Sequence, residues 1–104
     1  MKKLIMTLLS ISLIVFHASP SQSAFLNGNA LYEECQNNSG RCIWYIMGLI
    51  DMSELLPELY CLPSGATSGQ IHDIVVTWIQ ERPAERHNFA ADLFLDAMID
   101  AFPC

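Results

Sequence analysis

The chain has 104 residues, of which 5 are Lys or Arg and 11 are Asp or Glu, and this length allows one domain at most. Two of the five cations are Lys2 and Lys3, so the rest of the chain carries three arginines against eleven carboxylates, a formal charge of −8. Such a surface repels phosphate backbones and anionic membranes, which excludes nucleic acid as a partner, whereas a basic protein is attracted at long range.

The N-terminal segment has the order of a secretory signal peptide. The two lysines are followed by an apolar run from Leu4 to Phe16 and then by small residues. A run of about 13 residues is shorter than the roughly 20 that span a bilayer. We therefore predict a signal peptide over residues 1–24, cleaved after Ser23 or Ala24, and a mature domain over 25–104 without stable membrane association. No cysteine follows the cleavage region, which disfavours a lipoprotein anchor.

Four cysteines remain after this segment, and an even number in a short exported chain is typical of a disulfide framework. A domain of about 80 residues buries little apolar surface, so covalent cross-links are needed for stability. The spacings Cys-x6-Cys, Cys-x18-Cys and Cys-x42-Cys lack the close pairs of structural zinc sites, so we predict neither a metal nor a cofactor. The cysteines are Cys35, Cys42, Cys61 and Cys104.

Two helical segments come first in the chain. The first is predicted over about residues 28–36 and ends at the turn-forming residues 37–40. The second is predicted over about 42–56, before Pro57, and its nearly all-round apolar character fits a helix that is half core and half interface. Gly48 lies in its middle, where glycine costs about 1 kcal/mol relative to alanine, so we expect a closely packed neighbour at this position.

Two further helices complete an all-α fold of about four helices. The third begins at Thr67 in a capping box with Gln70, and five apolar residues then recur at helical spacing. These are Ile71, Ile74, Val75, Trp78 and Ile79. Pro83 ends this helix and is expected to open the next segment, which extends to about Ala101. The apolar stripe of the fourth helix comprises Ala90, Leu93, Phe94, Ala97, Met98 and Ala101.

The length of the second helix restricts the disulfide pairing. A helix from Cys42 to Leu56 is about 21 Å long, and the five residues that follow reach back at most about 18 Å. Cys61 therefore cannot come within the roughly 7 Å of Cys42 that a disulfide requires. In an up-and-down bundle, Cys35 and Cys42 share one end and the other two cysteines share the opposite end. We predict Cys35–Cys42 with Cys61–Cys104, and the alternative is Cys35–Cys61 with Cys42–Cys104.

We predict no catalytic residues and no enzyme activity. If all four thiols are oxidised, no nucleophilic cysteine remains, and the sequence has no GxSxG elbow, HExxH motif or phosphate-binding glycine loop. His72 and Asp73 could form a base and its orienting acid, but adjacent helical residues point about 100° apart, so we expect a polar helix face instead. His87 is expected in a surface turn.

Function is therefore expected to reside in surface residues. Asp51, the lone charge in the second helix, is expected to bond a backbone or hydroxyl group or to meet water. Four aromatic residues are expected in the core: Trp44, Tyr45, Trp78 and Phe94. The second helix has more apolar surface than such a core needs, and acidic residues recur every four positions on the fourth helix. We take as partner-binding candidates Trp44, Met47, Asp51, Asp92, Asp96 and Asp100.

Four segments, in order, resemble one protein family. They are similar to its opening segment, its Cys-x-x-Tyr-Ile-x-Gly-x-x-Asp helix, its Cys-x-Pro-x-Gly-x-Thr-x-Gly-Gln loop, and its Pro-x-x-Arg-His turn with a Phe-Pro-Cys ending. The segments are Asn27–Cys35, Cys42–Asp51, Cys61–Gln70, and Pro83–His87 with Ala101–Cys104. This pattern resembles the Rap/Tai immunity family of type VI secretion systems. Trp44 departs from it, because a glycine commonly precedes the tyrosine.

The resemblance implies a bacterial periplasmic protein that binds a peptidoglycan amidase effector injected by sister cells and blocks its active site. It also implies a helical fold that dimerises in characterised members and looks similar to small periplasmic acid-stress chaperones. A homodimer through the second helix would use Met47 and Gly48. The alternatives are an acid-stress chaperone and a small helical binding module that carries a lipid or another ligand.

Overall fold

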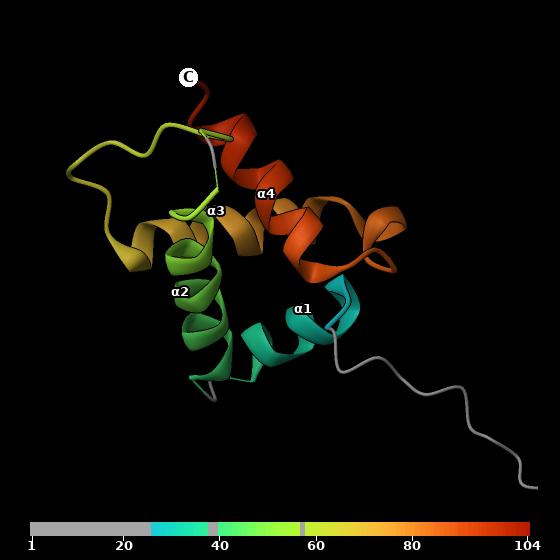
Figure 1. The fold of residues 1–104 in the computed structure, drawn as a ribbon. Helices are drawn as coiled ribbons and strands as arrows, with labels where there is room; N and C mark the ends of the chain where they lie inside the picture. The colour runs from blue at the N-terminus through green and yellow to red at the C-terminus, as the bar shows by residue number, and fades with distance from the viewer. Residues whose placement is uncertain (1–25, 38–39, 57) are drawn as a thin grey trace, which may run out of the picture.

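The computed structural model describes residues 26–37, 40–56 and 58–104. The predicted signal peptide, residues 1–24, lies outside the described residues. In the part of the chain that is described, four α-helices and one short 3₁₀ helix are present, which confirms the all-α prediction (Figure 1). The elements are α1 (Gly28–Gln36), α2 (Arg41–Ser53), α3 (Ser68–Glu81), η1 (Pro83–Glu85) and α4 (Ala90–Ala101).

Side-chain caps fix where two helices begin. The Asn27 side chain accepts a hydrogen bond of 2.9 Å from Ala30 N at the start of α1. Thr67 Oγ1 accepts from Gln70 N at 3.1 Å, which places α3 where the capping-box pattern predicted it. Helix α2 has no side-chain cap; it follows Gly40, whose positive φ of 76° is a conformation that favours glycine.

Helix α2 ends at Ser53, three residues before the predicted end. Ser53 Oγ donates to Ile50 O at 2.8 Å and also contacts the hydroxyl group of Tyr60. The next turn is tighter than an α-helix, because Leu55 N donates to Met52 O and Leu56 N to Ser53 O. The prediction was wrong here because Tyr60, beyond the helix, supplies a contact that no local pattern contains.

Helix α4 also begins in a way that the sequence did not reveal. Pro83 opens a single turn of 3₁₀ helix rather than a long helix, and α4 starts at Ala90. Ala90 N donates to Leu26 O at 2.8 Å, so the segment before α1 determines this start. The same two segments meet again where Gly28 N donates to Asn88 O and Asn29 N donates to Arg86 O, each at 2.9 Å.

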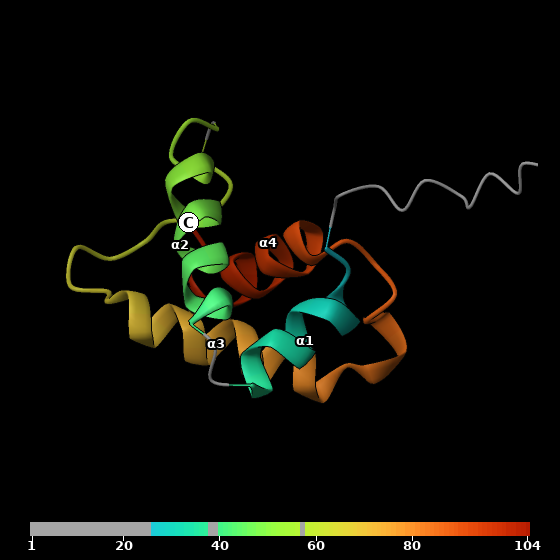
Figure 2. The same cartoon turned by 90° about the horizontal axis from the view of Figure 1, so that it is seen from below.

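The core lies around α3, which contacts each of the other three α-helices. Helix α3 crosses the molecule behind α2 and α4 in the view of Figure 1, and it lies below them in the view of Figure 2. The faces predicted from helical spacing supply most of the buried residues, and burial of such side chains is the main stabilising contribution. The buried apolar residues are Leu31, Cys42, Ile46, Ile71, Val75, Ile79, Ala90, Leu93, Phe94, Ala97 and Met98.

Two disulfides join the pairs Cys35–Cys42 and Cys61–Cys104. This is the favoured pairing, and no free cysteine remains in the described part of the chain. The up-and-down arrangement on which the prediction relied is not found, because α2 crosses α1 and α3 steeply in both views (Figures 1 and 2). The pairing still holds because only four residues of sequence separate α1 from α2. The chain after α2 returns to the end of α4, where Cys61 N donates to Phe102 O at 2.8 Å.

The expectation of a close neighbour at Gly48 was wrong. A Cβ atom built at Gly48 would meet no atom within 4 Å, and the residue is exposed. The glycine that does require a close approach is Gly28. There a Cβ would lie 2.4 Å from Leu93 Cδ1 and 2.8 Å from Arg86 O. Packing inside this chain therefore explains Gly28 but not Gly48.

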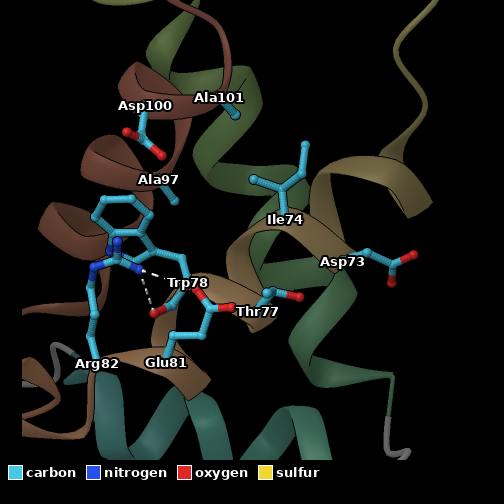
Figure 3. A pocket seen from close by; sticks show the side chains of 9 residues that line it. All are labelled: Asp73, Ile74, Thr77, Trp78, Glu81, Arg82, Ala97, Asp100 and Ala101. Atoms are coloured by element: carbon cyan, nitrogen blue, oxygen red, sulfur yellow. Dashed lines mark hydrogen bonds and ion pairs between the residues drawn. The ribbon is translucent and has the colours of Figure 1, made fainter.

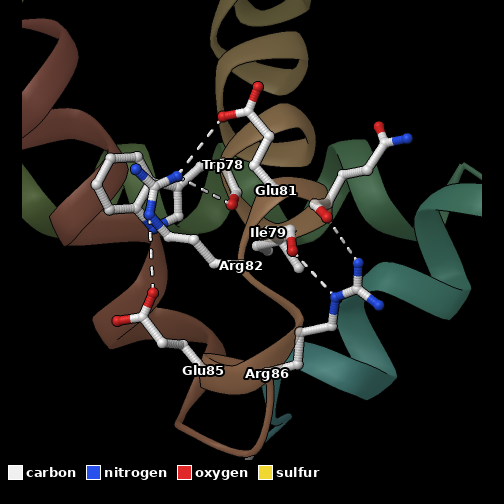
Figure 4. Close-up of polar contacts among 7 residues, drawn as sticks. Trp78, Ile79, Glu81, Arg82, Glu85 and Arg86 are labelled. Carbon is white, nitrogen blue, oxygen red and sulfur yellow. Dashed lines mark hydrogen bonds and ion pairs between the residues drawn. The ribbon is translucent and has the colours of Figure 1, made fainter.

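Two arginines after α3 hold its C-terminal end (Figure 4). Arg86 Nε donates to Ile79 O at 3.0 Å and Nη2 donates to Gln80 O at 2.9 Å, while the guanidinium lies 4.0 Å from the centre of the Tyr32 ring on α1. Arg82 lies 3.3 Å from the centre of the Trp78 ring and donates to Trp78 O. Arg86 therefore gives Ile79 O a second donor besides Arg82 N and binds the carbonyl of Gln80 in the last turn of α3.

Replacing Arg86 by alanine should lower the free energy of unfolding by about 2 kcal/mol, because it removes two charge-assisted hydrogen bonds and the contact with Tyr32. Arg86→Lys should recover little of this, because a single ammonium group does not reproduce the planar guanidinium. Urea unfolding of the oxidised protein measures both changes. Arg41→Ala is the control, because its side chain is 78% exposed and the change should cost less than about 1 kcal/mol. Equal losses at Arg41 and Arg86 would contradict the assignment.

Candidate partner-binding surface

An open hollow of about 360 Å³ lies between α3 and α4. Ile74 and Trp78 from α3 and Ala97 from α4 provide apolar surface (Figure 3). Carboxylates also line this hollow: Asp100 comes from α4, and Glu81 lies near the end of α3. We call this site the acidic hollow, and we define it by Ile74, Trp78, Glu81, Ala97 and Asp100, with Asp73 and Arg82 at its edge.

The acidic hollow carries negative charge because three carboxylates and one guanidinium line it. Arg82 is already engaged with Glu81 at 3.8 Å and with Glu85 at 3.7 Å, besides its contact with Trp78. Asp73 is 84% exposed and points away from the other labelled residues in Figure 3. Asp100 is exposed at the opposite edge. An aliphatic stem that ends in a cation would match this combination of apolar surface and carboxylates.

Helix α2 presents an apolar ridge on its outer side. Trp44 is 70% exposed, Met52 60% and Leu55, just beyond the helix, 78%. These residues follow one another at steps of about one helical turn, and the exposed Gly48 lies between them. We call this surface the α2 ridge, defined by Trp44, Gly48, Met52 and Leu55. The expectation that Trp44 belongs to the core was wrong, because the core is filled by the opposite face of α2 with Ile46.

The structure separates the six predicted partner-binding residues. Met47 and Asp51 line a small hollow beside Ile71, and Asp51 is exposed. Asp92 lines another hollow, while Asp100 lines the acidic hollow. Asp96 is exposed on α4 but is not among the residues that line the acidic hollow. The acidic stripe along α4 is therefore distributed over separate surfaces.

The hollow beside Asp92 is mostly apolar and contains Leu26, Tyr45 and Phe89. Burial raises the pKa of the Tyr45 phenol above its ordinary value of 10.0, because desolvation penalises the phenolate. The phenol is therefore neutral at neutral pH and presents an O–H donor next to an apolar wall. The hollow therefore offers a partner an apolar surface for packing and one hydrogen-bond donor, the Tyr45 hydroxyl group.

The prediction that His72 and Asp73 do not face one another was wrong. His72 Nδ1 lies 3.2 Å from Asp73 Oδ1, on the exposed side of α3. His72 also lies beside a disulfide, since one of its ring nitrogens and the sulfurs of Cys35 and Cys42 are all within 4.8 Å of one another. Both sulfurs are oxidised in the Cys35–Cys42 bond, so they offer no thiolate to a metal ion.

Sequence reasoning missed most of the acidic hollow. Ile74 and Trp78 were assigned only to the core, and Glu81 and Asp73 were not candidates. One available signal was that Asp73 and Glu81 lie on α3 close to its apolar stripe. Asp100 joins the same site because α3 packs against α4. The sequence pattern does not reveal this tertiary contact. Trp78 Nε1 is buried and has no hydrogen-bond partner among the described residues.

Within the described residues, four short helices and two disulfides define a small cross-linked helical protein that exposes apolar and acidic surface. The family model of the Rap1a immunity proteins matches residues 27–104, and the chain belongs to this family. No curated protein and no solved structure matches the chain. None of the helices within the described residues is long and apolar enough to cross a membrane.

Proposed function

We propose that this protein is a periplasmic immunity protein that binds and inhibits a peptidoglycan amidase effector delivered by a type VI secretion system. The observation that carries the proposal is the match of the immunity family over residues 27–104. The predicted signal peptide and the two disulfides are consistent with an oxidising compartment outside the cytoplasm. In this role the protein acts by occupying the surface of its partner.

The acidic hollow is the surface that we assign to the effector. Asp100 and Glu81 beside an apolar floor, with Asp73 at the edge, favour a basic side chain of the partner. Its aliphatic stem would cover Trp78 and its charge would lie near Asp100. The overall negative charge of the chain would accelerate the encounter with a basic effector surface. This assignment makes binding dependent on salt concentration.

Neutralising the acidic hollow should weaken binding of the effector. Asp100→Asn and Asp73→Asn remove charge without adding bulk, and each should weaken affinity by about threefold to fivefold, the range expected of exposed ion pairs. Surface plasmon resonance with the purified effector would show the loss mainly in the association rate and mainly at low salt. Asp96→Asn is the matched control, because Asp96 is exposed on the same helix but is not part of the acidic hollow.

Two outcomes bear on different parts of the proposal. Unchanged affinity in Asp100→Asn and Asp73→Asn would reject the acidic hollow as the contact surface. Failure of the wild-type protein to bind any amidase encoded beside it, together with unaltered amidase activity on purified peptidoglycan, would reject the amidase as the target. A strain that lacks the gene should be killed by sister cells that deliver the effector.

The α2 ridge is the surface that we assign to a second copy of the chain. It is apolar and exposed, and Gly48 at its centre would allow a second backbone to approach closely. Trp44→Glu should therefore convert a dimer into a monomer in sedimentation experiments, because it places a charge within an apolar contact. Gln80→Glu, on an exposed position of α3, should leave the dimer intact. A wild-type protein that sediments as a monomer at high concentration would reject this assignment.

A further inference from the structure

The Cys35–Cys42 disulfide lies in surroundings that differ from those of the second disulfide. It joins the last turn of α1 to the first turn of α2, and His72 from α3 lies beside it. Within the described residues, this is the one group in which two cysteine sulfurs and a histidine nitrogen come within 4.8 Å of one another. Asp73 contacts the His72 ring at 3.2 Å and orients it.

The two sulfurs of this disulfide are unequal. Cys42 is only 4% exposed, whereas Cys35 is partly exposed at the edge of the core. An incoming thiolate therefore reaches the sulfur of Cys35 more easily, and Cys42 becomes the leaving group. Cys42 is in the first turn of α2, where unpaired backbone N–H groups stabilise a thiolate. The nearby charges of Glu34 and Arg41 pair with each other at 3.5 Å, and a ring nitrogen of His72 lies within 4.8 Å of both sulfurs.

We propose that Cys35–Cys42 is a thiol–disulfide exchange site that oxidises small thiols, with Cys35 as the attacked residue, Cys42 as the leaving residue and the neighbouring His72 as its proton donor. This inference does not rest on the proposed immunity function. It assigns chemistry to a pair of cysteines that would otherwise only cross-link α1 to α2.

The exchange proceeds in two balanced steps. A small thiolate attacks Cys35 Sγ, the bond between the two protein sulfurs breaks, and Cys42 leaves as a thiolate that takes a proton through His72, which solvent replaces. A second small thiolate then attacks the sulfur of the first small molecule in the mixed disulfide. The bond between that sulfur and Cys35 Sγ breaks, and Cys35 leaves as a thiolate, which solvent protonates. Two small thiols are oxidised to one disulfide, and the protein disulfide is reduced by two electrons to two thiols.

Reduction by glutathione, followed by alkylation and mass spectrometry, tests the site in the full protein. Cys35–Cys42 should be reduced in wild type, with the mixed disulfide on Cys35. The rate should fall by about threefold or more in His72→Gln, since one pKa unit on a thiol gives this change at a Brønsted coefficient near 0.5. Reduction of Cys61–Cys104 in the same sample is the internal control and should not change. Equal rates at Cys35–Cys42 in wild type and His72→Gln would overturn the proposal.

A second measurement separates exchange chemistry from loss of structure. Cys35→Ser leaves Cys42 as the only free thiol, and its ultraviolet thiolate absorbance gives the thiol pKa in a protein still held by Cys61–Cys104. The pKa should lie below the ordinary value near 8.5 and should rise when His72→Gln is added. A Cys42 pKa at or above 8.5 that does not respond to His72 would mean that burial dominates, and the disulfide would then be a structural cross-link only. Circular dichroism of each variant establishes that the helices are retained.

Discussion

Replacing Cys61 and Cys104 together by serine is expected to lower the free energy of unfolding by about 4 kcal/mol. The disulfide joins residues 43 apart in the sequence, and closing a loop of this length removes a large part of the entropy of the unfolded chain. The hydrogen bond of 2.8 Å from Cys61 N to Phe102 O would also lose its covalent support. Urea unfolding under non-reducing conditions, followed by circular dichroism, measures the change.

The Cys35→Ser/Cys42→Ser protein is the matched control for this prediction. Its disulfide spans only 7 residues, so the same loop-entropy relation gives a loss of about 2 kcal/mol. The two double variants should therefore differ in stability by about 2 kcal/mol, with the Cys61/Cys104 variant the weaker. The reverse order would mean that native-state contacts, and not loop closure, determine how the disulfides stabilise the fold.

Gly28→Ala is expected to destabilise the protein by about 3 kcal/mol, at the upper end of the range for overpacking a core. The added methyl group would lie 2.4 Å from Leu93 Cδ1 and 2.8 Å from Arg86 O. Leu93 can change rotamer, but Arg86 O is backbone and accepts a hydrogen bond from Asn29 N at 2.9 Å. The chain must therefore move where residues 26–29 meet residues 86–90. Thermal and urea unfolding should both show the loss.

Gly48→Ala is the matched control, because it is the same substitution at an exposed position in the middle of α2. Nothing lies within 4 Å of its new methyl group, so the variant should gain up to about 1 kcal/mol from helix propensity. Opposite signs at positions 28 and 48 are the expected result. A loss at both positions in monomeric protein would show that the free space at Gly48 is used by the chain itself.

The sequence predicted the elements of the fold well because local chemistry determines them. Helical spacing identified the buried face of α3, and Thr67 marked its first turn. The end of α2 could not be predicted, since Ser53 is engaged with Tyr60 from a later segment. The steep crossing of α2 over α1 and α3 was also missed. The periodicity of apolar residues indicates which face of a helix is buried, but it does not indicate the angle at which that helix crosses its neighbours.

The candidate site was less predictable than the fold. Acidic spacing on α4 identified Asp100, but the partners of Asp100 in the acidic hollow come from α3 and depend on how the two helices meet. The proximity of His72 to Cys35 and Cys42 arises in the same way, from three helices that converge. Spacing along one chain excluded a zinc motif and gave no indication of this tertiary cluster.

Helix α1 has only 9 residues, and an isolated helix of this length is not stable in water. Here both of its ends are fastened: the segment at Gly28 bonds to Arg86 and Asn88, and Cys35 is covalently joined to α2. Fraying from either end is therefore suppressed, and the amides of α1 should open only when the whole domain opens. Native-state hydrogen exchange would then show protection in this shortest α-helix comparable to that of α3, which makes α1 part of the same cooperative unit.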